Sequence, residues 1–509
     1  METKTAAIEM RNITKRFGPV LANDKVWLNI YRGEILALLG ENGSGKTTLM
    51  NMLSGIYFPD EGEIKIDGKE VVIRSPKDAF DNGIGMIHQH FKLVDVLTAA
   101  ENIVLGLPGK LDLKAASAKI REICDKYGFS VDPTQKIYDM SVSQKQTVEI
   151  VKVLYRGADI LILDEPTAVL TPQETDKLFA VLRNMRNDGK AIVIITHKMH
   201  EVEALSDRVA ILRHGQFIGD MLTKDTNAQE MTNMMVGHAV SLNIERPDPV
   251  DPKPRIEVKG LTVRSVDGII KLDDVSFTAN SGEILGIAGI SGCGQKELLE
   301  AIAGLQTVES GSISYIEDDG SREELVGKDP LSIAELVVSL SFVPEDRLGM
   351  GLVGNMNLAD NMMLRSFRRG KSIFTDRRSP RALAEAVVQE LSVSTPSVDT
   401  PVRRLSGGNV QKVLVGREIA SAPTVLLTAY AVRGLDIHSS YTIYDLINRQ
   451  KKAGVAVIFV GEDLDVLLEL CDRILVLCGG KVSGIVPGRG AEKREVGMMM
   501  TKLGGQSHE

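Results

Sequence analysis

The chain has 509 residues, of which 43% are hydrophobic and 25% charged, and its formal net charge is −8. This length exceeds what one hydrophobic core usually supports, so we expect two or more domains. The acidic balance disfavours a nucleic-acid-binding protein, whose contact surface would be basic. No secretory signal or membrane-spanning run is recognisable, and the four cysteines lack metal-binding or disulfide spacing. These features predict a cytoplasmic protein whose membrane role, if any, requires a partner.

The first chemical motif along the chain is a phosphate-binding loop. Residues 40–47 read GENGSGKT, which fits G-x-x-x-x-G-K-[ST] between an apolar strand and a helix. Such a loop turns backbone N–H groups toward phosphate oxygens at a helix N-terminus. We expect Lys46 to reach the β- and γ-phosphates of a nucleotide and Thr47 to bind Mg²⁺. Upstream, Phe17 could stack on adenine. The predicted loop contacts are Gly40, Glu41, Asn42, Gly43, Ser44, Gly45, Lys46, Thr47 and Thr48.

Polar side chains also follow three later apolar runs. ILILDE (160–165) ends in Asp164, predicted to hold Mg²⁺ through water, and Glu165, predicted to activate the attacking water. AIVIITH ends in His197, predicted to contact the γ-phosphate at the carboxyl edge of a sheet. Gln89 follows a shorter apolar stretch and could bridge Mg²⁺ or the attacking water. Residues 92–158 read mainly as helix, which predicts a helical subdomain inserted into the core.

The chain repeats itself. YRGEILALLGENGSGKTTL (31–49) reappears as NSGEILGIAGISGCGQKEL (280–298), and later matches such as Asp207-Arg208 on Asp472-Arg473 keep a second fixed offset. The copies meet at ERPDPVDPKPR, whose prolines forbid continuous helix or central strand. Both halves alternate apolar β-branched runs with amphipathic stretches, the pattern of an α/β fold. We predict a first domain over 1–244, a linker over 245–255 and a second domain over 256–509.

The second copy has lost the side chains that the chemistry needs. Glutamine replaces the loop lysine, and lysine replaces the Mg²⁺-binding hydroxyl. The Asp-Glu pair, the glutamine and the histidine are also replaced. Backbone cradling of phosphate would remain possible there. The substituted positions are Gln295, Lys296, Glu345, Ala429, Tyr430 and Glu462.

The order of these motifs resembles the ATP-binding cassette (ABC) ATPases, twice over nearly the whole chain. The resemblance implies two tandem P-loop nucleotide-binding domains, each with a RecA-like core and a helical subdomain. It also implies head-to-tail pairing, in which each ATP lies between the P-loop of one unit and the LSGGQ signature of the other. The cofactors would be ATP and Mg²⁺.

The first copy has the intact phosphate-binding loop, but the second copy has the better-preserved signature segment. Residues 405–409 read LSGGN, nearly intact, whereas 140–144 read MSVSQ and lack both glycines. Glycine permits close backbone approach to the γ-phosphate. The good loop would then face the good signature within one intramolecular sandwich, which predicts one competent and one degenerate site. The signature residues predicted to contact ATP are Ser406, Gly407, Gly408 and Asn409.

Three functions compete: the energy subunit of an importer, a soluble translation or repair ATPase, and an ATP-gated scaffold. The degenerate second site, the short linker and the lack of zinc-binding cysteines favour the importer over translation and repair factors. The intact Lys46, Glu165 and His197 disfavour a scaffold. The chain resembles the carbohydrate-uptake group of ABC importers, with simple sugars such as ribose or galactose as one solute class.

Segments 84–106, 155–174 and 342–353 more closely resemble the branch that imports nucleosides with a lipoprotein receptor. The implied partners are two transmembrane permease subunits and, indirectly, an extracytoplasmic solute-binding lipoprotein, with no nucleic acid. The protein would lie at the cytoplasmic face of the membrane. Phe91, Lys92 and Leu93, beside the predicted glutamine position, are candidate permease contacts.

Overall fold

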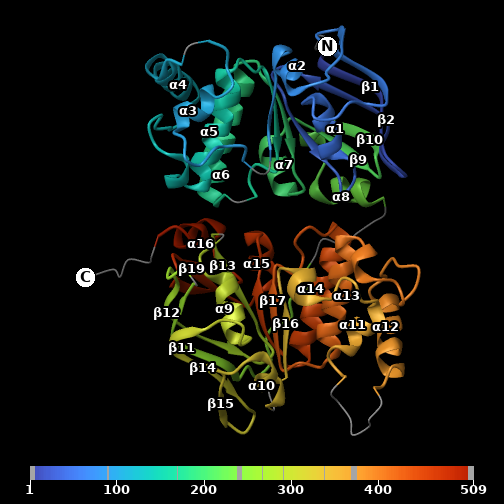
Figure 1. The fold of residues 1–509 in the computed structure, drawn as a ribbon, viewed down its shortest axis with the longest axis vertical. Helices are drawn as coiled ribbons and strands as arrows, with labels where there is room; N and C mark the ends of the chain where they lie inside the picture. The colour runs from blue at the N-terminus through green and yellow to red at the C-terminus, as the bar shows by residue number, and fades with distance from the viewer. Residues whose placement is uncertain are drawn as a thin grey trace. The chain divides into compact units, whose positions relative to one another are not determined.

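The computed structural model describes residues 6–88, 91–109, 111–168, 170–237, 244–265, 267–290, 292–336, 339–367 and 375–502. Contacts divide the chain into two compact units, Met1–Ser241 and Leu242–Glu509, here called domain 1 and domain 2. Each unit contains two sheets and a set of helices (Figure 1).

The centre of domain 1 is a six-stranded sheet in the order β10-β9-β3-β8-β7-β6. Its strands run parallel except β10, which pairs antiparallel with β9. The apolar runs predicted as strands form β3, β7, β8 and β9, and helices or a second sheet bury both faces of this sheet. The α/β prediction is confirmed. The strands are β3 (Ile35–Leu39), β6 (Ile84–Ile87), β7 (Ile160–Asp164), β8 (Ala191–Ile195), β9 (Arg208–Arg213) and β10 (Gln216–Leu222).

A four-stranded antiparallel sheet, ordered β2-β1-β4-β5, packs on one face of the central sheet. Alternating side chains of its long strands enter the shared core, as expected for a sheet with one solvated face. Its strands are β1 (Ala6–Phe17), β2 (Val20–Tyr31), β4 (Glu61–Ile66) and β5 (Lys69–Val71).

Helices cover the other face and form the predicted insertion between β6 and β7. There α3, α4 and α5 bury their own small core, and capping boxes at Thr98 and Ser141 begin two of these helices. The helices of domain 1 are α1 (Lys46–Leu53), α2 (Pro76–Asp81), α3 (Ala99–Val104), α4 (Leu113–Tyr127), η1 (Ile137–Asp139), α5 (Val142–Tyr155), α6 (Pro172–Asn187), α7 (Met199–Leu205), η2 (Thr223–Asp225) and α8 (Ala228–Val236).

Domain 2 repeats both sheets with the same strand order. Its antiparallel sheet runs β12-β11-β14-β15 and its central sheet runs β16-β17-β18-β13-β19-β20. The strands are β11 (Pro254–Arg264), β12 (Ile270–Asn280), β13 (Ile284–Gly289), β14 (Val308–Ile316), β15 (Arg322–Glu324), β16 (Leu340–Val343), β17 (Val425–Ala429), β18 (Ala456–Val460), β19 (Arg473–Cys478) and β20 (Lys481–Pro487).

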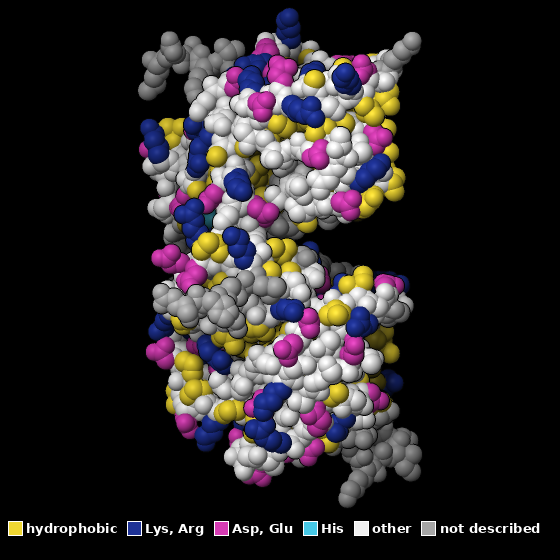
Figure 2. Space-filling view, turned by 90° about the vertical axis from the view of Figure 1, so that its left-hand side faces the viewer, with side chains coloured by type: hydrophobic (Ala, Val, Ile, Leu, Met, Phe, Trp, Pro, Cys, Tyr) yellow, Lys and Arg dark blue, Asp and Glu magenta, His cyan; other side chains and the backbone are white. Residues whose placement is uncertain are grey.

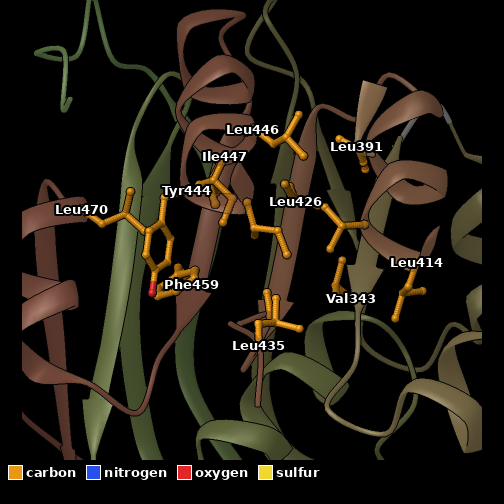
Figure 3. Packing of buried hydrophobic residues seen from close by; sticks show 14 of the residues in the cluster. Val343, Leu391, Leu414, Leu426, Leu435, Tyr444, Leu446, Ile447, Phe459 and Leu470 are labelled. Atoms are coloured by element: carbon orange, nitrogen blue, oxygen red, sulfur yellow. The ribbon is translucent and has the colours of Figure 1, made fainter. Parts of the chain in front are cut away.

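Domain 2 has two buried clusters, one of which lies between several of its helices and the central sheet. Figure 3 shows this packing, in which Leu414 of the helical layer lies near Val343 of β16, and the rings of Tyr444 and Phe459 meet edge to face with centroids 6.5 Å apart. The helices are α9 (Gln295–Ile302), α10 (Pro330–Glu335), η3 (Arg347–Gly351), α11 (Leu358–Met363), α12 (Arg378–Glu390), η4 (Val402–Arg404), α13 (Gly407–Ala420), α14 (Ile437–Lys452), α15 (Leu464–Leu470) and α16 (Lys493–Met499).

The proline-rich segment 245–255 is bonded to domain 2. Arg246 Nη1 donates to the Leu468 carbonyl at 3.1 Å, and Lys451 Nζ donates to the Pro247 carbonyl. β11 begins at Pro254, inside the segment predicted as linker. A proline tolerates this position because the first residue of a strand can do without a ladder donor.

The surface carries both signs of charge. On the face that Figure 2 shows, lysine and arginine side chains are interspersed with aspartate and glutamate and with small apolar patches. Such mixing is typical of an ordinary solvated surface.

Candidate active site

The loop between β3 and α1 is shaped by glycines that the backbone requires. Gly45 has φ 95°, and a Cβ there would lie 2.3 Å from the Ala22 carbonyl oxygen. At Gly40 a Cβ would lie 2.4 Å from the Leu212 carbonyl oxygen. Both positions exclude larger residues, so the loop is tightly held against β2 and β9.

Lys46, the first residue of α1, fills the inside of this loop. Its buried ammonium donates to the carbonyls of Gly40 at 2.7 Å and Glu41 at 2.9 Å. Burial lowers the pKa of Lys46, against the opposing effect of the nearby Glu165 and Asp164 carboxylates. A cation is thus held beside backbone N–H groups at a helix N-terminus, the arrangement that binds phosphate.

Thr47 and Asp164 come together from α1 and the end of β7. The Thr47 hydroxyl donates to Asp164 Oδ2 at 3.3 Å. Burial, with the neighbouring Glu165 charge, raises the pKa of Asp164 to about 6. Mg²⁺ prefers oxygen ligands such as a hydroxyl and a carboxylate. The raised pKa of Asp164 indicates that too little positive charge lies near its carboxylate, so Thr47 and Asp164 fit such an ion.

Glu165 and His197 form the adjacent pair. His197 Nδ1 lies 3.0 Å from Glu165 Oε1, and this hydrogen bond lowers the pKa of Glu165. Glu165 occupies a left-handed backbone conformation with φ 46°, and its N–H donates to the Ile195 carbonyl of β8 at 2.9 Å. A non-glycine residue in this region carries strain, which often marks a functional position. Glu165 is therefore held ionised at the sheet edge, beside His197.

The exposed aromatic rings of Phe17 and Tyr57 contact each other on domain 1. Phe17 ends β1, and its exposed ring meets that of Tyr57 at 71° with centroids 5.1 Å apart. From the Phe17 turn, β2 leads to Asn23, whose amide donates to the Gly45 carbonyl at 3.3 Å. Tyr57 was not predicted from the sequence. Its place shortly after the P-loop helix was the only available signal. Gln89, also predicted for this site, lies outside the described residues.

The two signature serines differ in their hydrogen bonds. Ser141 accepts from the Gln144 N–H and closes a capping box at the start of α5. Ser406 makes no such cap for α13. Its Oγ accepts instead from Asn409 Nδ2 at 2.8 Å, while Asn409 Oδ1 accepts from the Ser394 N–H at 2.9 Å. Ser141 is thus an ordinary N-cap, whereas Ser406, which is equally exposed, makes no cap hydrogen bond with α13.

The two signature glycines are not required by domain 2 itself. A Cβ on Gly408 would meet no atom closer than 3.6 Å, and on Gly407 the nearest neighbour would be the end of the Arg347 side chain at 3.3 Å. Neither has a positive φ. Glycine in the first turn of a helix weakens it. Domain 2 itself therefore supplies no steric or conformational reason for glycine at these two positions.

Domain 2 keeps the backbone of the catalytic edge without its chemistry. Tyr430, at the position of Glu165, has φ 52° and donates its N–H to the Val460 carbonyl at 2.9 Å. Buried Gln295 replaces Lys46, and its amide donates to the Ile290 carbonyl at 3.1 Å, the same backbone contact that Lys46 makes with Glu41. A neutral amide thus holds this loop.

An ion-pair cluster occupies the sheet edge of domain 2. Arg433 Nη1 lies 2.5 Å from Glu345 Oε1, and Arg433 Nε lies 2.8 Å from Glu462 Oε1. The guanidinium also lies 5.9 Å from the ring centroid of Tyr430. The residues that replaced the glutamine and the histidine therefore share one arginine, which the sequence did not reveal.

The fold and the geometry of domain 1 define a P-loop nucleoside-triphosphatase. Within the described residues, no helix combines the length and the apolar character needed to cross a bilayer. The family model "ABC transporter" matches residues 23–168 and 272–428, one span in each domain. The chain belongs to the ABC transporter family and is one of its ATP-binding ATPases.

The chain aligns with several relatives over nearly its whole length. The chain is 42% identical to the nucleoside import ATP-binding protein NupA of Lactococcus lactis subsp. cremoris (strain MG1363), with 99% of each chain covered. It is 40% identical to the guanosine import ATP-binding protein NupO of Bacillus subtilis (strain 168), with 97% of each covered. It is 38% identical to the ribose import ATP-binding protein RbsA 1 of Rubrobacter xylanophilus (strain DSM 9941 / JCM 11954 / NBRC 16129 / PRD-1), with 96% of this chain and 97% of that protein covered.

Proposed function

We propose that this chain is the ATP-hydrolysing subunit of a nucleoside importer, bound at the cytoplasmic face of the membrane. The observation that carries this proposal is the full-length identity of 42% and 40% to two proteins named for nucleoside and guanosine import. The 38% identity to a ribose import protein makes a simple-sugar importer the second candidate. In either case the solute passes through partner subunits.

The partners under this proposal are two transmembrane permease subunits, served by an extracytoplasmic solute-binding lipoprotein, with no nucleic acid. A pocket of about 430 Å³ on domain 2 suits a permease helix, because exposed apolar side chains line it directly after Glu345. Leu348, Met350 and Val353 supply this lining. In domain 1 the candidate contacts remain Phe91, Lys92 and Leu93, of which Lys92 is exposed.

We assign hydrolysis to one composite site that combines the P-loop of domain 1 with the signature of domain 2. The geometry of domain 1 supports the first half of this assignment, with Lys46, Thr47, Asp164, Glu165 and His197 gathered at one sheet edge. The exposed Ser406 and the two glycines that domain 2 does not itself require support the second half.

In this site each residue has a role that follows from its contacts. Lys46 and the loop N–H groups bind the β- and γ-phosphates, and Phe17 stacks on the base. Thr47 and Asp164 would hold Mg²⁺, with Gln89 as a further predicted ligand, and the ion would neutralise phosphate charge. Glu165 takes the proton of the attacking water while His197 holds its carboxylate in place. Ser406 and the N–H groups near Gly408 and Asn409 stabilise the γ-phosphate charge.

The importer is tested by solute uptake in cells that lack the chromosomal copy of this chain. Radiolabelled guanosine and ribose are supplied separately, and the chain is restored as wild type or as Lys46→Ala. We expect guanosine uptake to return only with the wild type. Restored ribose uptake alone would establish the second candidate, and recovery of the tagged chain on ribosomes instead of in membranes would contradict both.

A further inference from the structure

Domain 2 has a short insertion next to its signature. Val353 donates its N–H to Asn361 Oδ1 at 2.8 Å, as Val94 does to Asn102 in domain 1. From the end of β6 at Ile87 to Val94 is seven residues, whereas from the end of β16 at Val343 to Val353 is ten. The three additional residues lie in a stretch that contains the single π-helical turn η3 (Arg347–Gly351).

This turn is bonded to α13 at both of its ends. Arg417 Nη2 donates to the Gly351 carbonyl at 2.7 Å, and its counterpart Lys152 donates to the Lys92 carbonyl at 3.0 Å in domain 1. At the other end, Arg347 Nη1 donates to the carbonyl of the signature residue Gly407 at 3.2 Å. The corresponding stretch of domain 1, FKLVDV (91–96), contains no arginine. Among the described residues of domain 1, no side chain of this stretch donates a hydrogen bond to the matching segment 140–144.

Arg347 also replaces a connection that domain 2 has lost. In domain 1, Gln146 of α5 donates to the Pro166 carbonyl at 2.5 Å and ties the signature helix to the loop after β7. The matching Gln411 is buried and neither of its side-chain polar atoms has a partner among the described residues. Arg347 Nη2 instead donates to the Arg433 carbonyl in the loop after β17.

Arg433 in turn forms ion pairs with the two carboxylates of the degenerate site. Through Glu345, which directly precedes the turn, and Glu462, it anchors the loop to which Arg347 is bonded. Leu348 and Met350, which follow Arg347, line the pocket proposed for the permease. One arginine thus joins the pocket wall, the degenerate site and the signature.

We propose that Arg347 is a positioning residue for hydrolysis, which couples the pocket wall of domain 2 to the signature segment that serves the competent site. This inference rests on the proposed composite site. Displacement of the turn by a docked helix changes the direction of the Gly407 carbonyl and, with it, the first N–H groups of α13. The degenerate site of domain 2 is then the anchor of this coupling.

The geometry predicts which kinetic constant responds. Arg433 is exposed, so its ion pairs with Glu345 and Glu462 add little to stability. Arg347 is partly buried and donates to backbone carbonyls. The P-loop of domain 1 and Phe17, which bind the nucleotide, are untouched by a change at Arg347. Misplacement of a transition-state group lowers kcat with little change in KM.

The test measures ATP turnover and thermal unfolding of the full-length chain for Arg347→Met, Arg347→Lys and Arg381→Met. For Arg347→Met we expect kcat to fall about tenfold while the KM for ATP stays within about twofold. Arg347→Lys should recover most of the loss, because one ammonium can still donate to the Gly407 carbonyl. Arg381→Met is the matched control: it removes an exposed arginine of α12 that pairs with Asp399 at 2.8 Å and, among the described residues, makes no hydrogen bond to the signature.

Wild-type turnover in Arg347→Met would overturn the proposal, and so would a loss that Lys does not reduce and that follows a lowered Tm. Ser406→Ala, measured in parallel, separates this failure from that of the composite site. If Ser406→Ala is impaired and Arg347→Met is not, only the coupling role fails. If neither is impaired, the composite site itself is wrong.

Discussion

The edges of the two central sheets have the same backbone and different chemistry. Glu165 and Tyr430 both adopt positive φ, at 46° and 52°, and both donate an N–H to the neighbouring strand. Around Glu165 lie a histidine, an aspartate and a threonine. Around Tyr430 lie two glutamates paired with one arginine. The two turns therefore share one strained backbone, while their side chains form a carboxylate–histidine pair in domain 1 and an ion-pair cluster in domain 2.

This difference shows that backbone strain alone does not identify a catalytic residue. Strain at Glu165 accompanies a positioned carboxylate, whereas strain at Tyr430 accompanies a phenol whose pKa burial raises to about 12. Such a phenol stays protonated at neutral pH and cannot accept a proton from water. The shared turn is a property of the fold, and the side chains decide what it does.

The largest effect is expected from substitutions at Glu165, compared with the matched position Tyr430. Glu165→Gln should lower kcat for ATP hydrolysis by about 100-fold or more, because it removes the general base. ATP should still raise the Tm of the variant, since Lys46 and the loop remain. Tyr430→Phe, at the matched position, should leave turnover within about twofold. A steady-state ATPase assay checks both, and substantial turnover in Glu165→Gln would mean that domain 2 hydrolyses ATP.

The signature serines should separate in a similar way, with a smaller effect. Ser406→Ala should reduce kcat about tenfold because it removes one donor to the γ-phosphate, and it should leave the Tm nearly unchanged. Ser141→Ala should lose an N-cap worth about 1 kcal/mol and lower the Tm of domain 1 by about 2–4 °C, with turnover unaffected. Calorimetry and ATPase assays on the same preparations decide the matter. Equal losses of turnover would contradict the asymmetric pairing.

The sequence predicted the main features of both domains because strong local patterns encode them. The strands β3, β7, β8 and β9 were predicted from their apolar runs, and the helical insertion was predicted as well. The fold class and the family were confirmed by the observed sheets and by the match of the family model to both halves. The roles of the site residues and the composite site remain predictions.

What the sequence did not reveal depends on long-range contacts. The cluster at Arg433 joins residues 88 and 29 positions apart, from three different strand ends. The contact of Phe17 with Tyr57 requires β1 and α1 to be placed on the same side. Ser141 and Ser406 differ in the hydrogen bond that each hydroxyl accepts. The two segments have similar sequences, so this difference could not be predicted from the sequence. No local pattern fixes such contacts.

The last prediction concerns stability, and it tests what the buried carboxylate of Asp164 costs its domain. Asp164 is buried with its pKa raised to about 6, so its ionised form destabilises the folded chain, whereas the matched position holds buried Ala429. Asp164→Asn should abolish hydrolysis yet raise the free energy of unfolding of domain 1 by about 1–3 kcal/mol at pH 7. Because the folded pKa lies above the unfolded one, this gain should be full above pH 6. It should shrink as pH falls toward 4, where the wild-type carboxyl becomes protonated in both states. Calorimetric scans of both proteins between pH 4 and 8 measure it, and a gain that does not change with pH would show that Asp164 is not destabilised by its charge.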